Sequence, residues 1–405
     1  FPTVASKKFL ITIGDRSITG LVACQPMVGP WQEPVADVAV TLSGHRTFSG
    51  EAFAMGERSP LALINPAAAA RMTVAETLTN LIAADLSALD RVVLSANWMA
   101  AAGGDSEDQA LFDAVTAVGE EFCPALGIAI PVGKDSLSMQ TRWQHEGVDR
   151  RVVSPLTLIV SAFAPVDDVR RTLTPVMQSQ SDSVLVLFEF GQRRMGGSCL
   201  AQVYGQLGDT APDVDDAVAF KALLSWLLDA KRQGLILALH DRSDGGLITT
   251  LLEMAFASRL GLDVAIEASE DLVAALFNEE IGFVAQVEVA QLAELSAAAP
   301  CTVTAVAHLR VDERVLIHHG EELAAEYSRG ELQQLWADTS YRMQRLRDSE
   351  ACADEEFADI LQARHDDPGL SAKLTFEPAA RPTEAPYVNT DAKPSVAVLL
   401  SLIHI

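Results

Sequence analysis

The stretch that most constrains this chain is Leu237–Met254, where an apolar run leads into the turn HDRSDGG and then into an apolar-periodic segment. This order predicts a strand, a polar loop with two glycines, and a helix. In open α/β sheets, ligands bind beyond the carboxyl ends of the strands. The glycines let a ligand approach the backbone, and a helix N-terminus favours an anion. The stretch therefore predicts a Mg²⁺–phosphate site, with a helix-capping turn and solvated charges as the alternative.

Further oxygen-bearing side chains stand where they could complete such a site. Asp37 lies in the buried strand predicted over 36–42, and Glu76 and Asn80 lie in a helix predicted over 67–84. Residues four apart share one face of a helix. Together with Asp241, these side chains are oxygen donors of the kind that Mg²⁺ takes, and nucleotide phosphates would complete its shell. A polar stripe on a surface helix is the alternative for Glu76 and Asn80.

Several other nucleotide and catalytic motifs are excluded. The turn at 133–136 resembles a Walker A loop, but position 128 is Ile and Asp135 follows the lysine, which rules out a P-loop. Lys134 is either a point charge for a phosphate or an exposed turn lysine. The sequence has no GxGxxG fingerprint and no nucleophile elbow, so neither a dinucleotide fold nor a serine hydrolase is supported.

Size and composition narrow the class of protein. A chain of 405 residues that is 49% hydrophobic is expected to hold two or three domains. Its net charge of −25 is spread along the chain, which argues against nucleic-acid binding. No apolar run reaches the roughly 18–20 residues of a membrane span. Five widely spaced cysteines without a CxxC predict neither a disulfide framework nor structural zinc, and favour a cytoplasmic location.

The order of elements predicts the domain organisation. Alternating strands and helices over 183–318 indicate an α/β domain, and a boundary fits near 167–175. From 321 to 394 the chain turns into charged helices and then a proline-rich stretch typical of a linker. At the N-terminus, KFLIT over Lys8–Thr12 predicts a strand.

Eight motifs carry a resemblance to a known family. In chain order they are IGDRSITGLV, MVGPWQEPVADVAVT, GEAFAMGERSP, AETLTNL, LSANWMAAAG, IPVGKDSLSM, HDRSDGGL and LFNEEIG. Together they resemble the large, bacterial-type formylglycinamide ribonucleotide amidotransferases, or phosphoribosylformylglycinamidine synthases. The resemblance extends through Val398.

The resemblance implies a fold class of α+β / α/β. The family's synthetase region has two related halves, each with an α+β and an α/β subdomain of the aminoimidazole ribonucleotide synthetase type. This chain resembles the second half, with the α+β subdomain over 1–170, the α/β subdomain over 171–325, a linker over 326–393 and a truncated glutaminase start over 394–405. Because the chain begins without Met and ends in LSLIHI, we expect it to be a piece of a longer protein.

The resemblance also implies an activity and a site. The family makes formylglycinamidine ribonucleotide from formylglycinamide ribonucleotide, glutamine and ATP in purine biosynthesis, as an ATP-dependent C–N ligase. The matching Mg²⁺ ligands are Asp37, Glu76, Asn80 and Asp241, and the matching nucleotide contacts are Ala36, Ser243 and Lys7. In the family this second-half site is auxiliary and holds a tightly bound ADP, whereas the working ATP site depends on the first half.

What the chain lacks limits the activity that we expect of it. The first half, with its catalytic His-containing loop, and the glutaminase Cys, His and Glu have no counterpart here, so no catalytic residue is assigned. We expect an inactive fragment whose partners are nucleotide, ribonucleotide substrate, and the missing half and glutaminase domain, with no nucleic acid or membrane. The alternatives are a homodimeric ATP-using synthetase or kinase of the same superfamily, and a non-catalytic interaction module.

Overall fold

The computed structural model describes residues 1–17, 20–104, 106–179 and 182–377. Residues 1–367 form one compact unit and residues 368–405 a second. The glutaminase start predicted over 394–405, and the predicted linker beyond residue 377, lie outside the described residues. Among the helices that are described, none is long and apolar enough to span a membrane.

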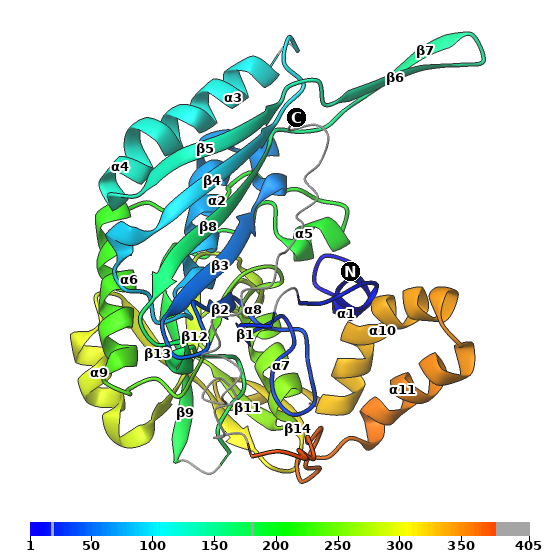
Figure 1. Cartoon of the computed structure of the whole chain (residues 1–405). Helices are drawn as coiled ribbons and strands as arrows, with labels where there is room; N and C mark the ends of the chain where they lie inside the picture. The colour runs from blue at the N-terminus through cyan, green and yellow to red at the C-terminus, as the bar shows by residue number, and fades with distance from the viewer. Residues whose placement is uncertain (18–19, 105, 180–181, 378–405) are drawn as a thin grey trace, which may run out of the picture. The chain divides into compact units, whose positions relative to one another are not determined.

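The first sheet of the larger unit lies in the N-terminal part of the chain (Figure 1). In the described residues its spatial order is β1 (Val22–Cys24), β2 (Ala39–Leu42), β3 (Gly50–Glu57), β8 (Thr157–Val166), β4 (Val93–Met99) and β5 (Ala129–Ser136). β3 alternates strictly between buried and exposed residues, because successive side chains of a strand point to opposite faces. Its buried residues face helix α2 (Pro66–Leu81), which begins with Pro66 and is capped by Asn65.

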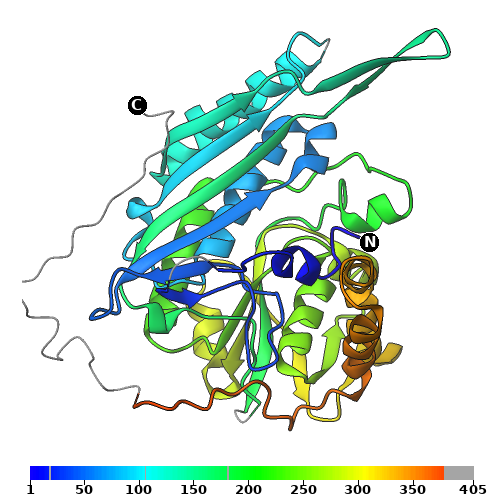
Figure 2. The same ribbon diagram turned by 45° about the vertical axis from the view of Figure 1, so that its right-hand side comes forward.

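The second sheet forms the C-terminal part of the same unit (Figure 2). Its order in the described residues is β10 (Ala238–Asp241), β12 (Gly282–Glu288), β9 (Ser183–Glu189), β13 (Thr302–Arg310), β11 (Gly261–Ile266), β14 (Arg314–His319) and β15 (Glu322–Ser328). Alternate residues of the apolar strand β9 face two cores, one with α6 (Ala217–Arg232) and one with α7 (Gly246–Ser258). Two sheets covered by helices confirm the predicted α+β / α/β fold class. Among the described strands of the second sheet, only β11 and β14 pair in parallel, so this sheet is mostly antiparallel.

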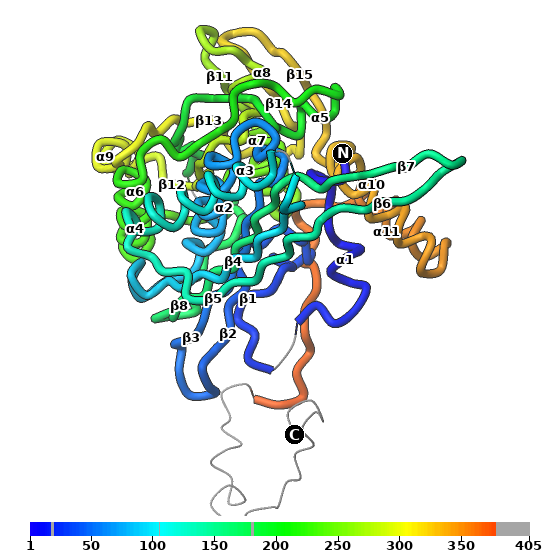
Figure 3. The backbone as a smooth tube through the Cα atoms, turned by 90° about the horizontal axis from the view of Figure 1, so that it is seen from above, coloured from blue at the N-terminus to red at the C-terminus, as the bar shows by residue number. Residues whose placement is uncertain are grey.

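The remaining elements are shorter or lie at the edges. They are α1 (Lys8–Thr12), η1 (Ser59–Leu63), η2 (Leu89–Arg91), α3 (Glu107–Thr116), η3 (Ala117–Phe122), α4 (Cys123–Leu126), η4 (Val169–Arg171), α5 (Cys199–Val203), α8 (Leu272–Phe277), η5 (Val289–Gln291), α9 (Leu292–Ala298), α10 (Arg329–Arg347) and α11 (Glu350–Gln362). The two-stranded ribbon of β6 (Gln140–His145) and β7 (Val148–Val153) extends away from both sheets (Figures 1 and 3).

The strand predicted over Lys8–Thr12 is wrong, because this segment forms helix α1. Tertiary contacts explain the difference. The Phe9 amide donates to Ser340 Oγ at 3.2 Å, and Lys8 forms an ion pair with Glu356, so α1 is held against the helical pair α10–α11. An apolar run of five residues does not distinguish a strand from a helix, and packing decided between them here.

A buried lysine on α6 bonds to the backbone just after α2, and so links a helix of the second sheet to a helix of the first. Lys231, on α6, is 8% exposed and donates hydrogen bonds to the carbonyls of Ile82 and Ala84, just beyond the C-terminus of α2. Burial lowers the pKa of Lys231 to about 7, although the nearby Asp85 opposes the shift. A neutral amine can still donate both hydrogen bonds, so the folded chain tolerates loss of the charge.

This lysine predicts a stability that rises with pH. Between pH about 7 and 10.5, the unfolded chain holds a proton on Lys231 that the folded chain has released. The free energy of unfolding should therefore increase across this window, by up to about 1.4 kcal/mol per pH unit. Urea unfolding of the wild type and of Lys231→Met at pH 7, 8, 9 and 10 checks this. The difference between the two chains should grow with pH, and parallel curves would contradict the prediction.

Candidate functional site

The stretch singled out from the sequence forms a strand, a sharp turn and a helix. β10 is buried throughout and ends at Asp241, one residue beyond His240, so both side chains belong to the strand rather than to the turn. Gly245 and Gly246 have φ of +85° and +72°, and α7 begins at Gly246. A Cβ on Gly246 would lie 2.6 Å from the Asn278 carbonyl oxygen, so only glycine fits here.

Two of the predicted metal ligands lie together at the end of β10. Asp37, Asp241 and His240 each have a ligand atom within 4.8 Å of the other two. His240 Nδ1 is 2.6 Å from Asp37 Oδ1 and 3.7 Å from Asp241 Oδ1, and its Nε2 is 2.9 Å from Glu253 Oε2. Asp241 is 3% exposed, and its Oδ2 has no hydrogen-bond partner within the described part of the chain.

The electrostatics of this cluster favour a cation. Burial, and then the neighbouring Asp37, raise the pKa of Asp241 to about 8. Burial alone would lower the pKa of His240, but Asp37 and Glu253 outweigh it and raise that pKa well above its ordinary value. A buried carboxylate with a free oxygen, beside further carboxylates, is costly unless a positive charge is present. The donor set therefore fits a hard cation such as Mg²⁺.

A second group of carboxylates surrounds one buried arginine. Arg58, which is 4% exposed, lies 3.6 Å from Glu76, 3.1 Å from Asp244 and 3.0 Å from Glu279. Burial alone would lower the pKa of Arg58, but these three carboxylates raise it. Cys199, Asp244 and Glu279 also have the spacing of metal ligands. Because the Arg58 guanidinium already pairs with both carboxylates, this group does not need a metal.

Glu76 connects the two groups. Its Oε2 accepts a hydrogen bond of 2.7 Å from the Glu57 amide, and its other oxygen faces Arg58. Burial raises the pKa of Glu76 well above its ordinary value, and the charges of Asp244 and Asp241 add to the rise. Glu76 is thus close enough to Asp241 for their charges to interact.

The other predicted residues lie around these groups in different ways. Lys7 donates to the carbonyls of its own segment, and the charges of Glu253 and Asp244 act on it, although burial has the larger effect and lowers the pKa of Lys7. Asn80 lies one turn from Glu76 on α2 and donates to the Met55 carbonyl at 3.0 Å. Ala36 precedes Asp37, and Ser243 lies in the turn after β10, where its carbonyl accepts from the Gly246 amide.

Sequence reasoning did not single out five residues that build the site. They are Arg58, His240, Asp244, Glu253 and Glu279. Four of them lie in motifs that the resemblance used, namely GERSP, HDRSDGG and LFNEEIG, so a charged residue in each motif was the available signal. Glu253 had no such signal, since a glutamate on a helix is ordinary.

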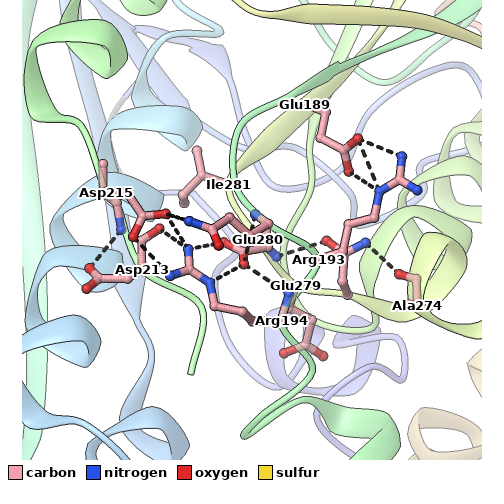
Figure 4. A network of polar contacts seen from close by, with 12 residues as sticks. Glu189, Arg193, Arg194, Asp213, Asp215, Ala274, Glu279, Glu280 and Ile281 are labelled. Carbon is pink, nitrogen blue, oxygen red and sulfur yellow. Dashed lines mark hydrogen bonds and ion pairs between the residues drawn. The ribbon is translucent and has the colours of Figure 1, made fainter. Parts of the chain in front are cut away.

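A separate ion-pair network holds the segment that carries Glu279 (Figure 4). The next residue, Glu280, is fully buried and accepts from Arg194 Nε at 2.6 Å, while Arg194 also pairs with Asp215 at 2.9 Å. Arg193 pairs with Glu189 at 2.9 Å. Glu279 itself accepts from the amides of Gly245 and Cys199, each at 2.8 Å. The network therefore holds the segment whose Glu279 side chain accepts the hydrogen bond from Gly245, at the start of α7.

Comparison with known proteins identifies both parts of this unit. Residues 6–165 match the model of the FGAR-AT PurM_N-like domain, and residues 180–318 match that of the AIR synthase related protein, C-terminal domain. The domain limits predicted above, at 170 and 325, are a finer division that stays a prediction.

Solved structures share the fold. The chain is similar to Thermotoga maritima PurL complexed with FGAR, with 14% identity, a TM-score of 0.58, and coverage of 81% of this chain and 50% of that one. It is also similar to Thermotoga maritima phosphoribosylformylglycinamidine synthase II, with 15% identity, a TM-score of 0.58, and coverage of 81% and 48%. PurL complexed with ATP matches with 14% identity, a TM-score of 0.54, and coverage of 81% and 48%.

This chain spans about half the length of the solved structures that it matches. Its two matched domains follow one another in the order that the family resemblance implies. The chain therefore contains an FGAR-AT PurM_N-like domain followed by an AIR synthase related C-terminal domain, and it shares the fold of the solved PurL structures.

Proposed function

We propose that this chain is part of the ATP-dependent ligase that forms formylglycinamidine ribonucleotide, and that it contributes a Mg²⁺–nucleotide site. Asp37, Glu76, Asn80 and Asp241 would hold the metal, and Ala36, Ser243 and Lys7 would contact the nucleotide. The observation that carries the proposal is the buried Asp241 carboxylate, which lies beside Asp37 and has an oxygen without a partner among the described residues. Solved PurL structures complexed with ATP and ADP support nucleotide as the ligand class.

Different residues of the chain would bind the metal and the phosphates. The carboxylates give the site its negative charge, and a bound Mg²⁺ would neutralise both these groups and the phosphates. The turn Gly245–Gly246 brings the backbone and the N-terminus of the 13-residue helix α7 to the same place, and the positive end of the helix dipole favours an anion there. Arg58 pairs most closely with Asp244 and Glu279, at 3.1 and 3.0 Å, and lies farther from Glu76, at 3.6 Å, which leaves Glu76 with Asp37 and Asp241 for the metal.

We further propose that the nucleotide is a tightly held ADP and that the chain alone does not turn over substrate. Two observations support this proposal: the chain matches one FGAR-AT PurM_N-like domain and one AIR synthase related C-terminal domain, and it spans about half of the solved PurL chain. Glutamine use would come from the glutaminase domain of the whole protein. The site would then stabilise the fold by binding, because a ligand bound only to the folded chain lowers its free energy.

The exposed apolar face of the first sheet is evidence that this chain binds a partner. Its exposed apolar side chains include Phe53, Met55, Val93, Val132 and Phe163, with the rings of Phe53 and Phe163 5.1 Å apart. Exposed apolar patches of this kind mark interaction sites. We propose the other synthetase half as the occupant. A second copy of this chain is the other candidate, and would make the protein a homodimeric ATP-using enzyme with measurable ATPase turnover.

The first test of the proposal is the nucleotide content of the purified chain. The chain is purified without added nucleotide and denatured, and released ADP and Mg²⁺ are quantified. We expect close to one ADP per chain, and no amidine when ammonia, ATP and formylglycinamide ribonucleotide are added. A chain that releases no ADP, and whose melting temperature does not respond to ADP with Mg²⁺, would overturn the site. Amidine formation would overturn the inactivity.

A further inference from the structure

Helix α10 lies outside both matched domains, yet it contacts the proposed site from three directions. The matches end at residue 318, and α10 spans Arg329–Arg347. It packs against α7 and α1 and lies beside the N-terminal segment (Figure 1). The sequence predicted only a charged linker helix in this region.

The first contact is a continuous line of polar side chains from α10 to Asp37. Trp336 Nε1 donates to Glu253 Oε1 at 3.1 Å. The other Glu253 oxygen faces His240 Nε2 at 2.9 Å, and His240 Nδ1 faces Asp37 Oδ1 at 2.6 Å. Both Glu253 oxygens and both His240 nitrogens are therefore engaged, which fixes the orientation of the His240 ring toward Asp37.

The second contact holds the loop that leads to Asp37. Gln333, one turn before Trp336 on α10, donates to Glu33 Oε1 at 2.8 Å. Trp336 packs against the buried cluster of Val28, Val35 and Ala257, and its ring lies 5.3 Å from that of Phe256 on α7. Ala36 and Asp37 thus directly follow Glu33 and Val35, which α10 contacts through Gln333 and Trp336.

The third contact holds the segment that carries Lys7. The Ser6 amide donates to the Trp336 carbonyl at 2.9 Å, and Ser340 Oγ donates to the Ser6 carbonyl. One helix therefore contacts the neighbour of Lys7, the loop before Asp37 and the carboxylate behind His240.

From this geometry we propose that Trp336 is a positioning residue for the Mg²⁺–nucleotide site, acting through Glu253 and His240 on Asp37. It follows that docking of α10 and binding of Mg²⁺–ADP strengthen each other, because the coupling between two sites is reciprocal. This inference rests on the proposed function of the site. It goes beyond that function by making a helix of the linker part of the nucleotide site.

The experiment measures the affinity for ADP at fixed Mg²⁺ by titration calorimetry, after bound nucleotide has been removed. Trp336→Phe keeps a ring against Phe256 but loses the indole N–H. We expect its affinity to fall about 10-fold, as for other groups that orient a metal ligand. The matched control is Tyr341→Phe on the same helix, which loses only the 2.7 Å hydrogen bond to Asp354 on α11 and should bind like the wild type.

Hydrogen exchange on the wild type supplies a readout that needs no substitution. Adding ADP with Mg²⁺ should slow amide exchange in α10 as well as in α7, and Trp336→Phe should abolish the effect in α10 alone. If the wild type binds ADP but α10 shows no protection, or if Trp336→Phe binds like Tyr341→Phe, the coupling is wrong while the proposed function stands. If the wild type binds no ADP at all, both the proposed function and the coupling between α10 and the nucleotide site are wrong.

Discussion

Replacing Arg58 by methionine is expected to lower the free energy of unfolding by about 3–5 kcal/mol, because the substitution breaks buried ion pairs and leaves their partners unpaired. Arg58 is 4% exposed, and its guanidinium faces Glu76, Asp244 and Glu279 within 3.6 Å. Glu76 and Glu279 are themselves buried, so water cannot replace the lost charge. Methionine fills most of the volume but supplies neither charge nor donors.

Urea unfolding of the nucleotide-free chain measures this loss. The matched control is Arg342→Met on α10, where the arginine side chain is 75% exposed and pairs with Asp338 at 2.8 Å. An exposed pair of this kind contributes about 0.3–0.5 kcal/mol. Adding Glu279→Gln to Arg58→Met should recover part of the loss, since one uncompensated charge is removed. Equal losses for Arg58→Met and Arg342→Met would contradict the prediction.

The strand, turn and helix that carry this site could be predicted from the sequence, because the signals for them lie within one short stretch. The apolar run before HDRSDGG, the glycine pair and the periodic segment after it fix β10, the turn and α7 within one short stretch. Helix α2 was predicted for a similar reason, since Pro66 opens it and no breaker interrupts it. In both cases the signal lies between neighbouring residues, where propensity and periodicity act.

The charge balance of the site could not be predicted, because it depends on contacts between distant parts of the chain. Arg58 pairs with Asp244 and Glu279, which lie 186 and 221 residues further on. Nothing in the sequence shows that Arg58 neutralises these two carboxylates, so they are as plausible as Asp241 for a metal. Only the fold shows that Asp241 keeps an oxygen to which no described residue bonds.

The secondary structure of the N-terminal segment also depends on contacts with distant residues. Lys8–Thr12 was predicted as a strand from its apolar run, and its helical form depends on Ser340 and Glu356, more than 300 residues away in α10 and α11. The linker region, which sequence reasoning treated as a connection, therefore shapes both the first helix and the surroundings of Lys7. Apolar runs and periodicity describe neighbouring residues only, and therefore do not predict packing between distant segments.

The second large effect is expected for Asp241→Asn, which keeps the size of the side chain but removes its charge. We expect the affinity for Mg²⁺–ADP to fall at least about 10-fold, equivalent to about 1.4 kcal/mol. The nucleotide-free chain should lose little stability. Within the part of the chain that the structure describes, the Asp241 carboxylate has a buried oxygen without a partner, and an amide there can donate toward the nearby Asp37. Because the pKa of Asp241 is raised to about 8, this carboxyl is largely protonated near pH 7 in the nucleotide-free chain, and the substitution changes little charge there.

Thermal unfolding with and without ligand separates these two effects. A ligand at 100 times its Kd stabilises the folded chain by about 2.7 kcal/mol, and a weaker ligand by correspondingly less. The rise in Tm on adding ADP and Mg²⁺ should therefore shrink in Asp241→Asn, whereas the exposed Asp229→Asn on α6 should keep the wild-type rise. Equal rises in Asp241→Asn and the wild type would remove Asp241 from the metal site. A loss of Tm that is as large without ligand as with it would assign Asp241 a structural role instead.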